Sequence, residues 1–381
     1  MAAVPAPVTP EVVRWAVQED GRRLSELADV VRVDEDTLRS WAEGDARPST
    51  GEVTRLAKAL RRPRALFFLP SAPRSATLPT GFRHPPGAAR EVSQAARMEV
   101  RRARRVQEAV SWALRDRDSI DLPRHELRED PERVGQEVRA WTGLTVAEQV
   151  QWSAGPYAAL AGWRDRFEEL GVLVFSIEIG RDEVRGFSSW DPWAPLIALN
   201  VSAVSPPARV FTLAHELGHL VTRTDSACIE PERLLVDVDI ERWCERFAAS
   251  LLMPRSDFQR LARLRRLGLR AAEINDVDGL MKHFHVSARA AALRMIDLGY
   301  AEPSFYAQVE SVYLPKAPET NDKKRRGSRP RDVQRLREYG PTALREVLNG
   351  LPEATALRVL RLTVEDARKL AKKVPGVNAA L

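Results

Sequence analysis

The sequence is poor in the residues that build disulfide frameworks or thiolate metal clusters. Only two cysteines, Cys228 and Cys244, occur in 381 residues, which excludes a disulfide-stapled fold and any zinc site with four cysteines. Long apolar runs are also missing, since no stretch reaches the roughly 18 residues that a membrane-spanning helix requires. The first residues, Met1 to Pro7, lack the charged and then apolar pattern of a secretory signal peptide. We therefore expect a cytoplasmic protein with no membrane partner.

Charge of one sign is not in large excess either. The 59 lysines and arginines stand against 53 aspartates and glutamates, which gives a formal net charge of +6. This balance permits an anionic partner such as DNA without requiring one. At roughly 100–200 residues per domain, the length predicts two or three domains.

The chain is interpreted as unlike segments in series, because no repeat of 20–50 residues is visible. Apolar residues recur at helical spacing through most of the chain, whereas two short runs, 172–177 and 195–200, are typical of buried strands. The expected fold class is therefore α+β and mostly α, with a small sheet. The expected divisions are a flexible tail (1–9), a helical domain (10–72), a Pro/Arg-rich connector and helix (73–135), a main domain (136–315), a basic linker (316–332) and a helical tail (333–381).

An arginine-rich helix is expected after the proline-rich stretch 71–87. We interpret it as an amphipathic helix with a solvated basic face, and a dedicated nucleic-acid surface is the alternative. The arginines concerned are Arg90, Arg97, Arg101, Arg102, Arg104 and Arg105.

The strongest chemical signal is the run His215-Glu216-Leu217-Gly218-His219. Ser205 followed by prolines predicts the start of a helix that carries residues 207–222. Residues four apart lie on one face of a helix, so the two imidazoles can reach one zinc ion. Glu216 is turned by about 100° from His215 and can sit beside the fourth coordination position to handle the proton of a water. This spacing predicts a zinc hydrolase.

A third zinc ligand must come from elsewhere, because catalytic zinc usually takes three protein ligands and a water. The two cysteines are interpreted as small buried apolar groups. His283 and His285 alternate, so on a helix they would point apart. The better candidates are the downstream carboxylates Glu230, Glu232, Asp237, Asp239, Glu241 and Glu245.

Glu241 and Glu245 both fall on a helix expected over about 240–253 and ended by Pro254. They differ by about 40° around the helix, so spacing alone does not choose between them. Glu241 lies at the border of the apolar stripe, and Glu245 lies further towards solvent. We therefore favour Glu241 as the third ligand, with Glu245, Asp237 and Asp239 as alternatives.

Two blocks of the sequence resemble the ImmA/IrrE-type zinc metallopeptidases. The first is Phe211–Leu220, which follows Ala198-Leu199-Asn200, and the second runs from Ile240-Glu241-Arg242 to Phe247–Pro254. The resemblance covers about residues 140–300 and implies a zincin-like domain. It also implies zinc held by His215, His219 and Glu241, with Glu216 as general base. Family members of this layout are bacterial or phage regulators that cleave or inactivate a partner transcriptional repressor.

The N-terminal segment resembles the helix-turn-helix of XRE-family regulators. Leu24–Ala28 matches the supporting helix, Val31–Val33 the turn and Asp34–Ala42 the recognition helix, and Trp41–Pro48 stands in the place of the family's Trp-Glu-x-Gly-x-x-x-Pro. The resemblance implies a DNA-binding domain over residues 10–72.

The expected recognition helix is a poor reader of DNA as it stands. Its candidates for base contacts, Thr37, Arg39 and Ser40, are flanked by acidic residues, and like charge against phosphate is unfavourable. Four arginines are candidates for contacts with the DNA phosphates. Operator binding and a protein-docking or dimerisation module of the same shape therefore both stay open. The four arginines are Arg22, Arg23, Arg32 and Arg47.

We expect a regulatory zinc metallopeptidase that cleaves a repressor protein. An extended substrate is expected to add to the edge of the small sheet near Leu196 to Asn200. The alternatives are a DNA-binding transcription regulator whose peptidase-like domain is a sensor without turnover, and a regulator that acts by binding alone. The sequence leaves the partner, the inducing signal and the oligomeric state open, and a dimer is compatible with it.

Overall fold

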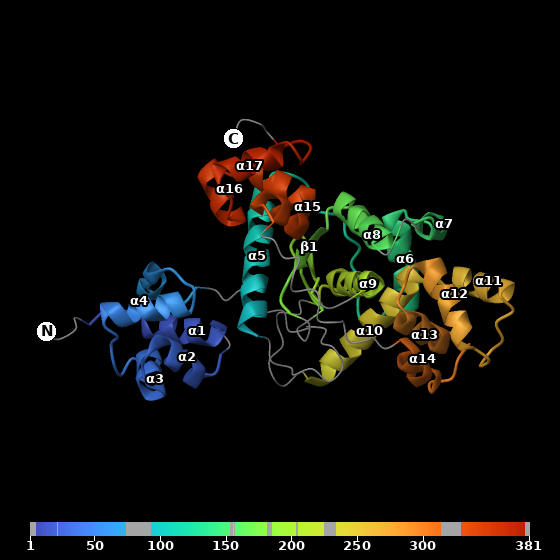
Figure 1. Cartoon of the computed structure of the whole chain (residues 1–381), viewed down its shortest axis with the longest axis horizontal. Helices are drawn as coiled ribbons and strands as arrows, with labels where there is room; N and C mark the ends of the chain where they lie inside the picture. The colour runs from blue at the N-terminus through green and yellow to red at the C-terminus, as the bar shows by residue number, and fades with distance from the viewer. Residues whose placement is uncertain are drawn as a thin grey trace. The chain divides into compact units, whose positions relative to one another are not determined.

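The computed structural model describes residues 5–20, 22–73, 93–152, 155, 157–180, 185–202, 205–224, 234–313 and 329–377, and only the backbone of residues 234–238. The chain divides into two compact units, residues 1–78 with 87–102 and residues 79–86 with 103–381. Both are mainly helical, and the described part holds one three-stranded sheet (Figure 1), as expected of an α+β, mostly α fold. No helix among the described residues is long and apolar enough to cross a membrane.

The N-terminal unit is a cluster of short helices around an apolar core. Side-chain caps set two of its helix starts: Asp34 accepts a hydrogen bond from the Thr37 amide, and Ser49 forms a capping box with Glu52. Its core buries Leu27, Leu38, Trp41, Leu56 and Phe67, among others. The elements are α1 (Pro10–Asp20), α2 (Leu24–Val31), α3 (Glu35–Glu43), α4 (Thr50–Ala59) and the 3-10 helix η1 (Arg64–Phe68).

Residues 5–9, expected to belong to a flexible tail, are packed against this unit instead. The Ala6 amide donates to the Pro48 carbonyl, and Pro5 forms a bridge with Ser49. Ala6 and Val8 are buried in the core. The composition of this short terminal segment did not predict that it would be buried.

The second unit contains the small sheet and most of the remaining helices. Helix α5 (Gln94–Leu114) precedes it in the chain and is the expected arginine-rich helix; four of its arginines are half-buried rather than fully solvated, Arg105 is exposed, and Arg90 lies outside the described residues. The helices that follow are α6 (Pro131–Thr142), α7 (Val146–Val150), α8 (Ala158–Glu169), α9 (Pro206–Thr222), α10 (Leu234–Leu252), α11 (Arg255–Leu264), α12 (Ile274–Phe284), α13 (Ala288–Asp297) and α14 (Phe305–Tyr313).

The sheet has the order β1-β3-β2, with β1 (Leu173–Ile177) parallel and β2 (Gly186–Ser189) antiparallel to β3 (Leu196–Asn200). The two expected strands are therefore confirmed as β1 and β3. The expected substrate edge at Leu196–Asn200 is wrong, because β3 is the central strand and is paired on both sides. Strand β2 escaped prediction because its four residues include a glycine and two serines and carry no apolar alternation.

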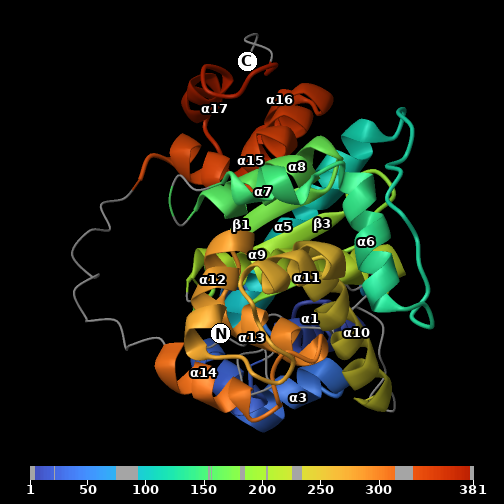
Figure 2. The same ribbon diagram turned by 90° about the vertical axis from the view of Figure 1, so that its right-hand side faces the viewer.

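The two faces of the sheet pack against different helices (Figure 2). Val174, Ile197 and Leu199 join the main core, to which α9 contributes. The alternate residue Phe175 points the other way and contacts the Tyr339 ring edge-on at 5.0 Å. Tyr339 belongs to α15 (Arg331–Gly350), which packs on β1 and is kinked at Gly340, and α16 (Glu353–Leu360) and α17 (Val364–Ala371) follow it.

Most of the expected basic linker (316–332), namely residues 316–328, lies outside the described residues.

Candidate metal centre

The His-Glu-x-x-His run lies on α9, which is buried along most of its length. Ser205 occupies the N-cap position and Pro206 lies in the first turn, as expected, although the Ser205 side chain makes no capping hydrogen bond. His215 and His219 are both buried, and their rings lie 5.1 Å apart between centroids. The helical spacing of four thus brings both imidazoles to one face.

A glycine one residue before His219 allows α10 to approach α9 closely. A Cβ atom at Gly218 would lie 3.1 Å from both Cys244 Sγ and Phe247 Cδ1 of α10. Because the two helices cross so closely, Glu241 of α10 lies next to the histidines of α9.

Glu241 bridges the two imidazoles. Its Oε2 lies 3.1 Å from His215 Nε2, and its Oε1 lies 3.2 Å from His219 Nε2. One ligand atom from each of the three residues falls within 4.8 Å of the others, and no second group of this kind occurs in the described ranges. Two imidazole nitrogens and a carboxylate oxygen are a donor set that suits catalytic zinc.

The pKa values of Glu241 and His219 are shifted in opposite directions. Burial alone would raise the pKa of the Glu241 carboxyl, but hydrogen bonds from His215 and His219 outweigh burial and hold that pKa far below its ordinary value. Burial alone would lower the pKa of His219, but its contacts with Cys244, Glu241 and Glu216 hold it well above its ordinary value. An anionic carboxylate facing two imidazoles is therefore the favoured state, and a divalent cation would satisfy the same three groups.

A hydroxyl supports His219 from behind. Thr224 Oγ1 lies 3.2 Å from His219 Nδ1, and Thr222 Oγ1 lies 2.8 Å from Thr224 Oγ1. Such a contact on the second ring nitrogen orients a metal-ligating imidazole.

Glu216 is fully buried but is not one of the three clustered residues. Its Oε2 accepts a hydrogen bond from Ser188 Oγ of β2 at 2.9 Å. The carboxylate is thus held by the sheet beside the histidine it follows in sequence, which suits a base better than a ligand.

Residues 167–295 match the family model of the IrrE N-terminal-like domain of peptidase family M78. The match covers about a third of the chain, runs from the end of α8 to α13, and includes the sheet, α9 and α10. It supports a metallopeptidase-type regulatory domain. It does not extend to residues 10–72. A search of curated proteins found no match.

The competing ligands are placed elsewhere or lie outside the description. Glu245 is half-buried and Asp239 exposed, and neither belongs to the cluster. Cys244 is fully buried, and burial raises the pKa of its thiol, in keeping with a small apolar group. Cys228, Glu230, Glu232 and the side chain of Asp237 lie outside the described residues.

The two downstream histidines do not approach the cluster. His283 lies in the last turn of α12, and burial together with positive charge from Arg260 and Arg265 lowers its pKa. His285 caps the same helix, and its Nε2 lies 3.2 Å from the Val150 carbonyl.

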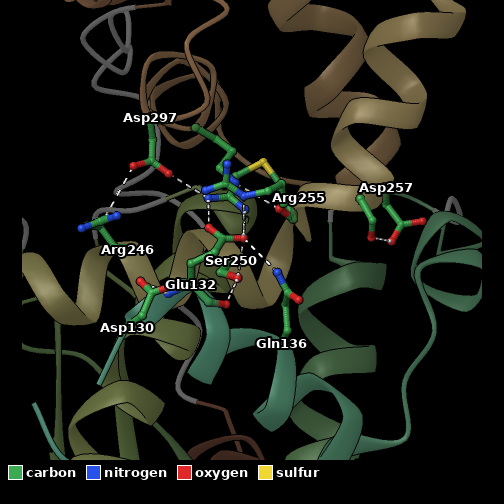
Figure 3. Close-up of polar contacts among 11 residues, drawn as sticks. Asp130, Glu132, Gln136, Arg246, Ser250, Arg255, Asp257 and Asp297 are labelled. Carbon is green, nitrogen blue, oxygen red and sulfur yellow. Dashed lines mark hydrogen bonds and ion pairs between the residues drawn. The ribbon is translucent and has the colours of Figure 1, made fainter. Parts of the chain in front are cut away.

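A buried ion-pair network fixes α10 against α6 and α13 (Figure 3). The Arg294 guanidinium is fully buried and donates to both Glu132 oxygens, at 2.6 and 2.8 Å, and to the Met253 carbonyl at 3.0 Å. Ser250 Oγ of α10 donates to the Glu132 carbonyl at 2.8 Å. The network lies at the far end of α10 from Glu241 and holds the helix that carries this residue.

The candidate DNA-reading side chains of α3 are engaged within their own helix. Arg39 pairs with Glu35 at 2.7 Å and with Asp36 at 2.8 Å. Thr37 Oγ1 donates to Asp34 at 2.8 Å, and Ser40 Oγ donates to the Thr37 carbonyl at 2.9 Å.

The four arginines proposed for phosphate contacts fall into two groups, two that form ion pairs within the unit and two that are exposed. Arg22 forms an ion pair with Asp20 at 2.6 Å, and Arg23 pairs with Glu26. Arg32 caps α2 in the left-handed conformation, and both Arg32 and Arg47 are exposed.

Proposed function

We propose that this chain is a regulatory zinc metallopeptidase that cleaves a partner transcriptional repressor. The observation that carries the proposal is the buried cluster of His215, His219 and Glu241 with the Glu216 carboxylate held next to it. Its position inside the segment that matches the IrrE N-terminal-like domain supports the same reading.

In this proposal His215, His219 and Glu241 hold the zinc ion. When bound, zinc supplies a Lewis acid that polarises the scissile carbonyl and lowers the pKa of water. Glu216 accepts a proton from the attacking water as the water oxygen bonds to the carbonyl carbon. Glu216 then gives that proton to the amide nitrogen as the carbon–nitrogen bond breaks.

An extended substrate would be presented by β2 rather than β3. Strand β2 is an outer strand of the described sheet, and its Ser188 contacts Glu216. Strand addition fixes a peptide substrate through main-chain hydrogen bonds. A peptide added to the outer side of β2 would therefore be held next to the strand that contacts the proposed base.

The N-terminal unit is proposed to be a helix-turn-helix that docks a protein or DNA. The order of α2, the left-handed residue Arg32 and the capped α3 supports that motif. The arginine of α3 is paired with acidic neighbours, which favours a protein partner over sequence-selective DNA reading. A DNA-binding regulator whose peptidase-like domain lacks turnover is the second candidate, supported by the exposed Arg32 and Arg47.

The test is a cleavage assay on repressor proteins encoded beside this chain, read by mass spectrometry. Zinc-loaded wild-type protein should cut one of them at a defined bond, and Glu216→Gln should retain zinc and fold but lose cleavage by several orders of magnitude. Cleavage by Glu216→Gln at the wild-type rate would remove Glu216 from the mechanism. Intact repressors with zinc-loaded wild type would favour the regulator without turnover.

A further inference from the structure

The face of β2 that meets α9 is built from two very small residues. Ser188 is opposite Ile197 and Gly186 is opposite Leu199 in the antiparallel register, so both lie on the face of the sheet that packs on α9. Residues two apart on a strand share a face. Large side chains are therefore absent where β2 passes Glu216.

The two small residues have different roles next to the Glu216 carboxylate. Ser188 Oγ donates to Oε2 at 2.9 Å, with both residues buried. A Cβ atom on Gly186 would lie 3.5 Å from Oε1 and only 2.9 Å from Thr212 Cγ2 and from the Ala198 carbonyl oxygen. Ser188 thus binds one carboxylate oxygen, and Gly186 allows β2 to lie close to Thr212 of α9 and to β3.

A carboxylate that acts as a base must be held in one orientation. The glutamate side chain has several rotatable bonds, and a displacement of about 1 Å from the productive position can lower a rate by about a hundredfold. A hydroxyl on a rigid strand supplies the orienting contact from outside the helix that carries the base.

We propose that Ser188 is a positioning residue for Glu216. Its hydroxyl fixes Oε2 and thereby sets the orientation of the whole carboxylate, while Gly186 lets β2 lie close to Thr212 of α9. The inference rests on the proposed function, since it assigns Ser188 to the same base, and nothing in the sequence motif itself points to Ser188.

The experiment uses the full chain loaded with Co²⁺ and the probe acetohydroxamate, followed by the visible spectrum of the metal. This probe binds a divalent metal as its anion, so its proton must pass to a nearby base. The variants are Ser188→Ala, Ser188→Thr and Glu216→Gln. Ser189→Ala is the matched control, because it removes the same hydroxyl from the next residue, on the opposite face of β2. Metal content and thermal unfolding are measured for each.

We expect acetohydroxamate to bind about tenfold more weakly to Ser188→Ala, and at least as weakly to Glu216→Gln. Ser188→Thr, which keeps the hydroxyl, should recover to within about threefold of the wild type, and Ser189→Ala should match the wild type. Metal content should be the same throughout.

The other outcomes contradict the inference in distinguishable ways. Wild-type binding by Ser188→Ala together with weak binding by Glu216→Gln would overturn the role of Ser188 and leave the proposed function standing. If Ser188→Ala and Ser189→Ala lost acetohydroxamate affinity equally, or if Ser188→Ala lost its metal, the effect would come from general disturbance of β2 and not from the Ser188 hydroxyl. Wild-type binding by Glu216→Gln would overturn the role of Glu216, and that of Ser188 with it.

Discussion

His215 and His219 each approach one oxygen of Glu241, so the proposed zinc site depends on three side chains from two helices. Purified protein should therefore carry about one zinc per chain. His215→Ala and His219→Ala should each lose it, because two remaining ligands do not hold catalytic zinc. Elemental analysis of the three proteins measures this directly, and full zinc in the His219→Ala protein would place the metal elsewhere.

The chemistry of the individual residues was predictable to different degrees. A helical spacing of four brought His215 and His219 together, and the border of an apolar stripe favoured Glu241, because both arguments depend on one local helix. The approach of Glu241 to the histidines also needs the crossing of α9 and α10 at Gly218. Ser188 and Thr224 could not be predicted, because their contacts depend on tertiary packing and no motif marks them.

At the scale of elements, the buried pair of Arg294 and Glu132 joins α13 to α6 and, through the Met253 carbonyl, to the end of α10. Arg294→Met should lower the free energy of unfolding by about 3 kcal/mol or more, since it leaves the Glu132 carboxylate buried without its main partner. Adding Glu132→Leu should recover most of that loss, because an apolar pair leaves no buried charge. Urea unfolding of the wild type and the two variants measures both effects, and equal stability of all three would show that the pair is not a structural link.

The same pair predicts how stability depends on pH. Burial alone would raise the pKa of Glu132, but its bonds with Arg294 outweigh burial and lower that pKa from 4.5. A carboxyl with a lowered folded-state pKa contributes stability that is complete above 4.5 and is lost as the pH falls through the folded-state value. The acid loss of stability should therefore be smaller in Arg294→Met than in the wild type.

Helices and strands were predictable where one local pattern decides them. Helix α9 and strands β1 and β3 follow the expected ranges closely, whereas α10 begins about two turns earlier than the apolar stripe indicated. Strand β2 has too few apolar residues to be recognised alone and exists because it pairs with β3 and packs on α9. The order of the sheet, and therefore the position of its outer strands, is a property of the fold rather than of any one segment.

At the scale of the whole molecule, the N-terminal unit is proposed to dock a second partner besides the substrate. Five of its seven candidate DNA-contacting side chains form contacts within the unit. DNA binding should therefore be weak, steeply dependent on salt and made mostly to phosphate. A gel-shift titration at two salt concentrations tests this. Tight and sequence-selective binding at physiological salt would favour the transcription-regulator alternative.

The account of the whole chain depends most on the identity of the third ligand, because Glu241 is the residue that α10 adds to the described cluster of His215 and His219. Competition with a chromophoric chelator gives the zinc affinity of Glu241→Gln and Glu245→Gln. Glu241→Gln should lose at least about a hundredfold in affinity, and Glu245→Gln, whose carboxylate lies outside the cluster, should bind as the wild type does. A large loss in Glu245→Gln with Glu241→Gln unaffected would contradict the metal centre described above.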